Sequence, residues 1–203
     1  MKKTVFFLLV ALCSLQNFAA NKFYPATLIK VDGEKIECLI KEIGIGDKKL
    51  KYKESLNSKP VSIHSNELTR AIIHYDEGDV VWDYVKYIGY RSFLRGKNKV
   101  SKDPQWMQLV VSGPCSLYTW SVTTRQNGFT NIDNWYACKK QDEDASNIIG
   151  TDQDGFFDPF FKRLPDYFSD YPELAEKIKA KKYTRKNIVE IVNEYNLEKS
   201  IKK

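Results

Sequence analysis

The residues best suited to acid–base or metal chemistry are two histidines, His64 and His74, both in stretches that predict β-strands. A metal site would require them to converge with carboxylates such as Glu67 or Asp76, because zinc takes three or four protein ligands. Neither histidine lies in a compact ligand motif. The sequence therefore favours ordinary surface or cross-strand histidines, and it predicts no metal and no cofactor.

A nucleophile is also poorly supported. Cys115 with a histidine and a carboxylate could form a reactive thiol, but none of the local signatures of such enzymes surrounds it. Residues 112–116, Ser-Gly-Pro-Cys-Ser, are typical of a turn that enters a strand, and no Gly-x-Ser-x-Gly motif occurs. We therefore expect that the protein is not an enzyme, and a hydrolase is the least favoured function.

Two ligand-binding patterns are incomplete. Asp152-Gln-Asp154-Gly155 partly matches a calcium loop but lacks the glutamate required further on, and Gly44-Ile-Gly46 lacks the remainder of a phosphate-binding loop. The acidic cluster that contains the first pattern is better explained as a solvated linker. Its members are Asp142, Glu143, Asp144, Asp152 and Asp154.

All four tryptophans, Trp82, Trp106, Trp120 and Trp135, fall in predicted strands. Exposed aromatic rings on a sheet could stack on sugars or hold an apolar partner, which makes Trp82, Trp120 and Trp135 candidate ligand contacts. Packing in the core, against the aromatic helix described below, explains most of them more simply.

The N-terminus has the three-part pattern of a secretory signal peptide. Lys2 and Lys3 precede an apolar run over residues 5–12, and Ala19-Ala20 marks a cleavage site, so residues 1–20 are expected to be removed. We expect an exported protein that is periplasmic, associated with the cell envelope, or secreted. No second apolar run reaches spanning length, so the mature chain should lack a transmembrane segment, although peripheral membrane contact stays open.

Positive charge is concentrated near the C-terminus. The formal net charge is +6, and residues 172–203 carry nine Lys or Arg against five Glu. Lys181, Lys182 and Arg185 are therefore candidate contacts for an envelope partner, while a solvated helical face is the simpler explanation. Nucleic acid is not expected as the partner of an exported protein.

Three cysteines remain after cleavage, Cys38, Cys115 and Cys138. In an oxidising compartment they could form one disulfide and leave one thiol. Small buried thiols are the alternative for at least one of them.

Residues 21–140 predict a β domain. Asp32-Gly33 favours a tight hairpin, and the connections between later strands are mostly short, so an antiparallel meander or open barrel of about nine strands is expected. Residues 141–155 are predicted as the acidic linker. The predicted strands are residues 26–31, 35–40, 50–52, 60–64, 67–74, 80–87, 106–111, 115–122 and 134–139, and residues 89–104 are predicted as an exposed connection.

Residues 156–203 predict a helical tail of about three short helices packed on the β domain, which makes the fold class α+β. Asp158-Pro159 is expected to start the first helix, Pro165 to break or kink it, and residues 170–173 to cap the second. A third begins near Thr184. The apolar stripe of the first helix comprises Phe157, Phe160, Phe161, Leu164 and Phe168, and that of the third comprises Ile188, Ile191, Val192 and Tyr195.

The tail carries a family resemblance. Residues 167–174, Tyr-Phe-Ser-Asp-Tyr-Pro-Glu-Leu, and 188–196, Ile-Val-Glu-Ile-Val-Asn-Glu-Tyr-Asn, resemble the ending of a group of uncharacterised exported proteins of Bacteroidetes bacteria. Residues 31–36 resemble the opening strand pair of that group, and residues 116–120 resemble a later strand. Tyr171 stands where that group often has cysteine. The resemblance implies export and a β-rich body with a helical tail, and it implies no activity.

These observations rank three hypotheses. The first is a non-catalytic, exported, envelope-associated protein that binds a partner through its sheet or its basic tail. The second is a ligand- or glycan-binding module that uses exposed strand tryptophans. The third is a hydrolase.

Overall fold

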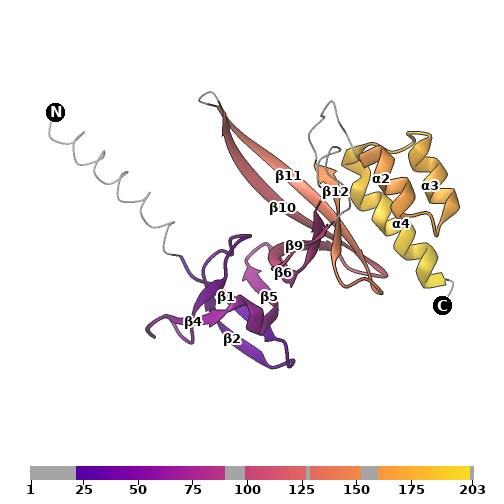
Figure 1. Cartoon of the computed structure of the whole chain (residues 1–203). Coiled ribbons are helices and arrows are strands. Elements are labelled where there is room, and N and C mark those ends of the chain that lie inside the picture. The colour runs from indigo at the N-terminus through magenta and orange to yellow at the C-terminus, as the bar shows by residue number, and fades with distance from the viewer. Residues whose placement is uncertain (1–21, 90–98, 127–128, 152–159, 202–203) are drawn as a thin grey trace. The chain divides into compact units, whose positions relative to one another are not determined.

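The computed structural model describes residues 22–89, 99–126, 129–151 and 160–201 (Figure 1). The predicted signal peptide, Phe157, Asp158-Pro159 and the incomplete calcium motif at residues 152–155 lie outside these ranges. The chain divides into two compact units, and the division falls between Val80 and Val81. The boundary therefore lies inside the predicted β domain and not between the strands and the helices.

Unit 1, up to Val80, is an antiparallel sheet in the order β4-β3-β2-β1-β5. The predicted hairpin is confirmed, since Leu28 pairs with Ile36 and Gly33 adopts a φ of +89°, which favours glycine. Alternate residues along the strands, such as Leu28, Ile40 and Ile73, are buried on one face. The strands are β1 (Tyr24–Lys30), β2 (Lys35–Ile40), β3 (Lys49–Lys53), β4 (Val61–His64) and β5 (Leu68–Tyr75), with a short 3-10 turn η2 (Ser65–Glu67).

Unit 2, from Val81, has the strand order β6-β9-β10-β11-β12-β7-β8. β12 pairs with β7 in parallel, so the sheet is mixed and the prediction of a purely antiparallel one is wrong. β6 begins at Gly78, just before the division. The strands are β6 (Gly78–Val85), β7 (Tyr87–Gly89), β8 (Lys99–Val100), β9 (Gln105–Val111), β10 (Cys115–Gln126), β11 (Phe129–Lys140) and β12 (Ser146–Thr151).

The described residues form twelve strands rather than about nine. The three unpredicted ones are β7, β8 and β12. β7 and β8 have only three and two residues, too few for a periodic pattern, and pairing with neighbours holds them. β12 occupies part of the predicted acidic linker. Its adjacent Ile148 and Ile149 interrupt the alternation by which a half-buried strand is recognised.

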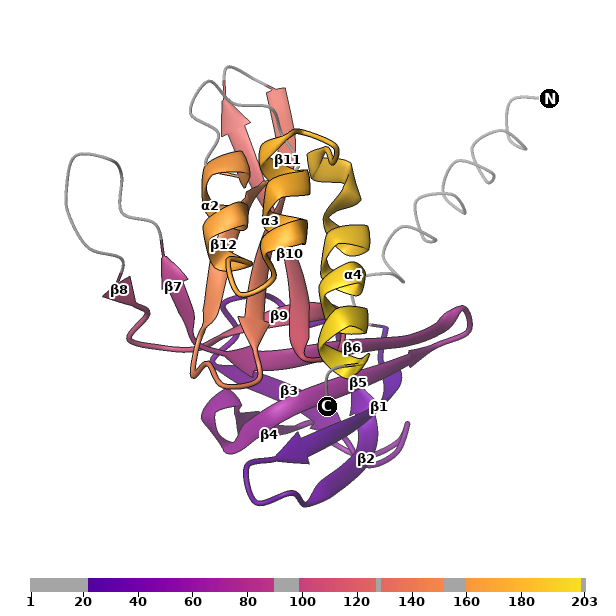
Figure 2. The ribbon, with the colours of Figure 1, turned by 90° about the vertical axis from the view of Figure 1, so that its right-hand side faces the viewer.

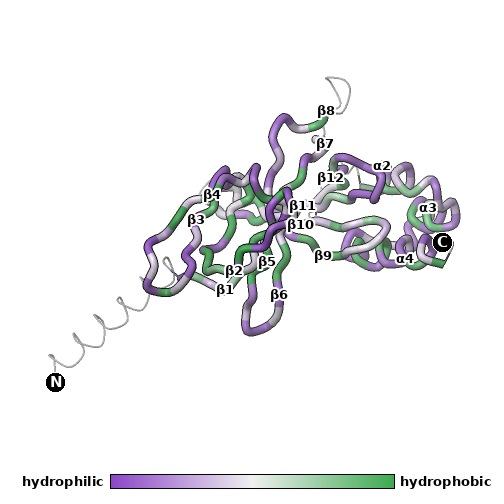
Figure 3. The backbone as a smooth tube through the Cα atoms, turned by 90° about the horizontal axis from the view of Figure 1, so that it is seen from below, coloured by the Kyte–Doolittle hydropathy of each residue, from purple (hydrophilic) through white to green (hydrophobic). Residues whose placement is uncertain are grey.

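Three α-helices follow the strands in the described residues: α2 (Phe160–Tyr167), α3 (Pro172–Lys179) and α4 (Ile188–Ile201), the last preceded by the 3-10 turn η3 (Arg185–Asn187). They lie side by side over β10, β11 and β12 (Figure 2). Their buried residues share one core with strand residues such as Leu117, Cys138 and Ile149. Green and purple alternate along these helices when the chain is coloured by hydropathy (Figure 3). The helices therefore pack on strands of unit 2.

Two details of the helical tail differ from expectation. Pro165 does not end α2, which continues to Tyr167; its side chain is buried, and proline removes only one backbone hydrogen bond in so short a helix. The predicted capping box of α3 is wrong, because Tyr171 is the N-cap and makes no side-chain cap bond. Asp170 is engaged elsewhere. At the third helix the prediction is confirmed, since Thr184 and Asn187 form a capping box before α4.

β10 and β11 are much longer than predicted and pair over twelve residues each. β9 accompanies β10 only as far as Thr119, and β12 accompanies β11 only from Trp135 inward. Figure 1 shows the pair continuing beyond β9 and β12. We call residues 121–126 of β10 and 129–134 of β11 the arm. None of the helices in the described part of the chain is long and apolar enough to span a membrane.

Candidate functional site

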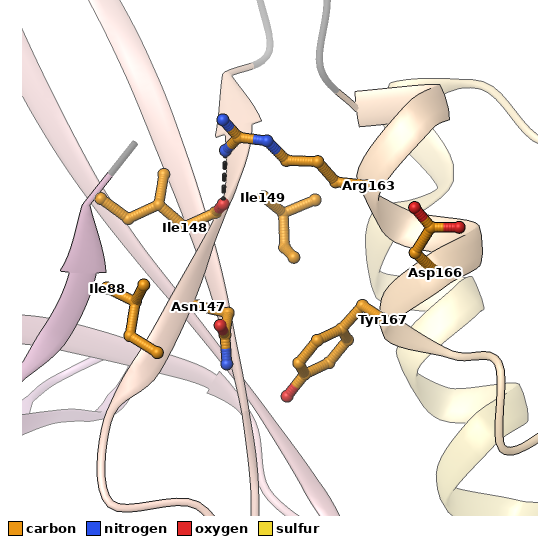
Figure 4. Close-up of a pocket in the computed structure, with 7 residues that line it drawn as sticks. All are labelled: Ile88, Asn147, Ile148, Ile149, Arg163, Asp166 and Tyr167. Atoms are coloured by element: carbon orange, nitrogen blue, oxygen red, sulfur yellow. Dashed lines mark hydrogen bonds between the residues drawn. The ribbon is translucent and has the colours of Figure 1, made fainter. Parts of the chain in front are cut away.

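Unit 2 contains a pocket of about 340 Å³ between its strands and α2 (Figure 4). Residues of α2 spaced three and four apart face the pocket from one side, and consecutive residues of β12 face it from the other. One apolar residue of β7 completes the wall. The lining comprises Ile88, Asn147, Ile148, Ile149, Arg163, Asp166 and Tyr167.

The polar groups of this pocket fasten α2 to the strands. Arg163 donates from Nη1 to the carbonyl oxygen of Ile148 at 3.0 Å. Glu143 accepts from the Tyr167 hydroxyl at 2.6 Å and from Asn147 Nδ2 at 3.0 Å. Burial, followed by the nearby thiols and Glu143, raises the pKa of Tyr167 well above its usual value, so its hydroxyl remains a donor. These hydrogen bonds hold α2 on the strands, so the polar groups have a structural role and the pocket is a recess beside them.

A second polar cluster joins the helices to the base of β11. Lys140 Nζ lies 2.7 Å from Asp170 Oδ1, and Asp170 Oδ2 accepts from Tyr195 at 2.7 Å and from Lys199 at 2.8 Å. The Lys140 ammonium also lies over the rings of Tyr167 and Tyr195, at 4.8 and 5.3 Å from their centroids. Asp170 is therefore the common acceptor that ties α4 and the α2–α3 connection to the hairpin.

Asn196 of α4 holds the first residue of β10. Its Oδ1 accepts from the backbone N–H of Cys115 at 2.6 Å, and its Nδ2 donates to the carbonyl oxygen of Cys115 at 2.9 Å. The Asn196 amide therefore bonds both backbone groups of Cys115, as the backbone of a neighbouring strand would. Gly113 makes room for it, because a Cβ there would lie 2.6 Å from Asn196 Nδ2. Asn196 had no predicted role, and the available signal was a polar residue one helical turn after Val192, beside the apolar stripe.

The three described cysteines are buried free thiols. Cys115 is paired in register with Lys140 and Cys138 with Leu117, so the two cysteines are diagonal neighbours on one face. A hydrogen bond with Cys115, followed by burial, raises the pKa of Cys138 well above its usual value. Burial raises the pKa of Cys38 to about 11. Neither Cys38 nor Cys138 has the depressed pKa of a reactive thiolate.

In unit 1, His74 takes part in a chain of polar contacts across four strands, β6, β5, β1 and β2. Its Nδ1 lies 2.7 Å from Asp79 Oδ1, and its Nε2 lies 3.0 Å from Thr27 Oγ1. Thr27 Oγ1 also donates to Glu37 Oε2 at 2.8 Å. The hydroxyl has one proton, which can go to Glu37 or to His74 but not to both. The order of these groups, carboxylate, imidazole and hydroxyl, resembles that of an acid–base relay. Thr27 is only 8% exposed, however, so little of its hydroxyl is accessible to a substrate.

The predicted histidine–carboxylate pairings are only partly formed. The carboxylate beside His74 is Asp79 and not Asp76, while Glu67 accepts from the backbone N–H of His64 at 3.1 Å. The structure does not bring the two histidines together, and residues 22–89, 99–126, 129–151 and 160–201 contain no group of three or more residues suited to hold a metal ion.

The candidate tryptophans are more enclosed than a sugar platform requires. Trp120 is 7% exposed, Trp82 and Trp135 are partly buried, and Trp106 is fully buried. Trp120 and Trp135 form a cross-strand pair with ring centroids 6.1 Å apart and planes 16° apart. The core beneath the helices includes none of the four, because Trp120 and Trp135 alternate to the opposite face from Leu117 and Cys138.

The basic tail is partly neutralised within the molecule. Lys181 and Lys182 are exposed as predicted, but Arg185 is only 9% exposed and donates to the Thr151 carbonyl oxygen at 3.5 Å. The prediction of Arg185 as an outward contact is wrong, because η3 turns it toward β12. Other tail lysines form ion pairs with neighbouring glutamates or with Asp170, at 2.8 to 3.0 Å: Lys177 with Glu173 and Glu194, Lys179 with Glu176, and Lys199 with Asp170.

The arm presents a different kind of surface. Beyond Thr119 and Trp135, no third strand within the described part of the chain pairs with β10 or β11, so both edges of the ribbon are open. The described side chains of the arm are exposed or partly buried, and Ile132 is 57% exposed. No family model, curated protein or solved structure matches the chain. Its function is therefore inferred from its own surfaces and contacts.

Proposed function

We propose that this is a non-catalytic exported protein that binds a protein partner in the cell envelope by accepting a strand of that partner on an edge of the arm. The observation that carries the proposal is the open-edged ribbon at residues 121–126 and 129–134. Edge strands present unpaired backbone N–H and C=O groups, which are a template for another strand. Export is supported by the predicted signal peptide and by the resemblance to exported proteins.

Natural sheets usually protect such edges with lysine, proline, a bulge or a short strand. The arm contains no lysine or proline, and the pairing of β10 with β11 is uninterrupted along it. Only two of its twelve residues are charged, Arg125 and Asp133, and the others are mainly β-favouring or small polar ones such as Ser121, Val122 and Thr123. A two-stranded ribbon is also only marginally stable alone. A third strand, supplied by a partner, would pair the open edge and stabilise the two-stranded ribbon.

The size of the edge sets the expected strength. Six residues in an antiparallel pair exchange about six backbone hydrogen bonds, each contributing a net of about 1 kcal/mol. Ordering the partner consumes part of this gain, so side chains such as Ile132 must supply the specificity. A moderate-affinity, strand-mediated interaction is therefore expected.

The experiment compares the exported protein with a variant whose arm is shortened. Replacing residues 122–133 by Asn-Gly joins Ser121 to Asn134 through a tight turn and retains the part of the hairpin that β9 and β12 flank. Capture from envelope extract should recover a partner with the natural arm and lose it with the short arm. Val31→Lys, at a 65% exposed position in unit 1, is the matched surface control and should retain the partner. Equal recovery by all three proteins would refute the role of the arm.

A further inference from the structure

A second surface, in unit 1, differs from the arm in both charge and shape. The β3–β4 hairpin lies at one edge of the unit 1 sheet, in which β4 is the outermost strand. Residues 48–61 carry five lysines against one glutamate, Glu54. This short stretch therefore contains a large share of the protein's excess positive charge.

The lysines of β3 lie on one face. Lys49, Lys51 and Lys53 alternate along the strand, so their side chains repeat about every 7 Å on the same side. Lys49 and Lys51 are exposed, and neither forms an ion pair among the residues that the structure describes. Their cross-strand partners are His64 and Ser62, neither of which is acidic. Unlike Lys177, Lys179 and Lys199 of the tail, which form ion pairs, these charges remain available to a partner.

An apolar side chain projects beside them. Leu56, in the connection from β3 to β4, is 75% exposed. The connection is held by hydrogen bonds: Ser58 N donates to Ser55 O at 3.2 Å, and Ser55 N donates to Ser58 Oγ at 3.1 Å. Lys53 Nζ donates to the Leu56 carbonyl oxygen at 3.3 Å. The turn therefore holds its leucine outward.

We propose that the β3–β4 hairpin docks on an anionic lipid bilayer, with Leu56 inserted at the headgroup level and Lys49 and Lys51 facing the lipid phosphates. The positive strand face complements a negatively charged surface. Lysine is a mobile point charge that suits a diffuse field of phosphates, whereas arginine suits a fixed bidentate partner. An exposed leucine at a projecting tip gains from an apolar layer, which a soluble polyanion would not offer.

The expected contributions are measurable. Each lysine near an anionic membrane surface strengthens binding about fivefold, and the effect weakens as salt screens the charges. Inserting one leucine contributes about tenfold. The Glu54 carboxylate opposes the lysines, so Glu54→Gln should strengthen binding by up to about fivefold.

The experiment measures binding of the exported full chain to vesicles of phosphatidylglycerol mixed with phosphatidylcholine, and to vesicles of phosphatidylcholine alone. We expect binding to the anionic vesicles only, about 25-fold weaker for Lys49→Gln/Lys51→Gln and at least about tenfold weaker for Leu56→Asp. Lys181→Gln/Lys182→Gln removes two exposed tail lysines and should change binding less than twofold. Thermal unfolding of each variant checks that the exposed substitutions leave the fold intact.

Three results would overturn the proposal. The first is equal binding to neutral and anionic vesicles. The second is an equal loss for the tail and β3 double variants. The third is full binding by Leu56→Asp together with competition by soluble polyphosphate, which would assign the lysines to a soluble polyanion. None of these results depends on the arm, so this proposal and the proposed strand-mediated function fail independently.

Discussion

Asn196→Ala should cost the protein more stability than any exposed substitution on α4, because the amide satisfies both backbone groups of buried Cys115. Leaving a buried donor or acceptor unsatisfied costs about 1–3 kcal/mol, so the loss of two predicts about 2–6 kcal/mol in the free energy of unfolding. The lower part of that range applies if water enters the space beside Gly113. Asn193→Ala, at an exposed position on the same helix, should cost less than about 0.5 kcal/mol.

Gly113 provides an independent test of the same contact. A Cβ at this position would meet Asn196 Nδ2 at 2.6 Å, so Gly113→Ala should destabilise the natural protein by about 1–3 kcal/mol. In the Asn196→Ala background the obstruction is gone, and the cost should fall close to zero. The two substitutions should therefore be strongly non-additive.

Urea unfolding followed by tryptophan fluorescence is the appropriate assay. All four tryptophans lie after Val81, so their emission reports on unit 2, where Asn196 and Gly113 are found. Asn196→Asp adds a useful comparison, since it keeps the acceptor for Cys115 N–H but places an oxygen against the Cys115 carbonyl. A cost below about 1 kcal/mol for Asn196→Ala, or equal effects of Gly113→Ala in both backgrounds, would refute the reasoning.

Two further predictions concern the carboxylate of Asp170 and the three buried thiols. Partial burial acts to raise the pKa of Asp170, but hydrogen bonds from Lys140, Lys199 and Tyr195 outweigh it and hold the pKa well below its usual value. Its carboxylate therefore stabilises the fold above about pH 4, and the contribution is lost as the pH falls further. At pH 7, Asp170→Asn should cost about 1–2 kcal/mol after allowance for its partial exposure, and the difference should narrow in urea titrations at lower pH, whereas exposed Asp144→Asn should show little effect. Because Cys38, Cys115 and Cys138 are buried and the pKa values of Cys38 and Cys138 are raised, a thiol reagent at neutral pH should label them only after denaturation; rapid labelling of the folded protein would contradict the structure.

Elements governed by local pattern could be predicted from the sequence. The Asp32-Gly33 hairpin, the strands that flank residues 112–114, and the apolar stripe of α4 all depend on residues close together in the chain, and the structure confirms them. β12 pairs with β11, the strand just before it, but its adjacent Ile148 and Ile149 obscure the alternation typical of a strand. β7 could not be predicted, since it is held by β12, a partner distant in sequence. The same applies to Asp170, which has the spacing of a helix cap but is captured by Lys140, thirty residues away.

The surfaces were harder to predict than the fold. Counting charges indicated the tail, but ion pairs occupy Lys177, Lys179 and Lys199, and Arg185 is buried. Which charges are neutralised depends on tertiary contacts. The open edges of the arm were equally hidden, because a strand pattern reveals alternation but not how many neighbours a strand has.

The central claim is that a partner strand pairs with the arm in the envelope. Photo-crosslinking in exporting cells tests it most directly, with a photoreactive residue placed at Thr123 or Ile132 of the arm, or at Val31 as the control. The account predicts one discrete crosslinked protein from both arm positions and none from Val31. An absence of crosslinks at the arm, or the same products from Val31, would contradict it.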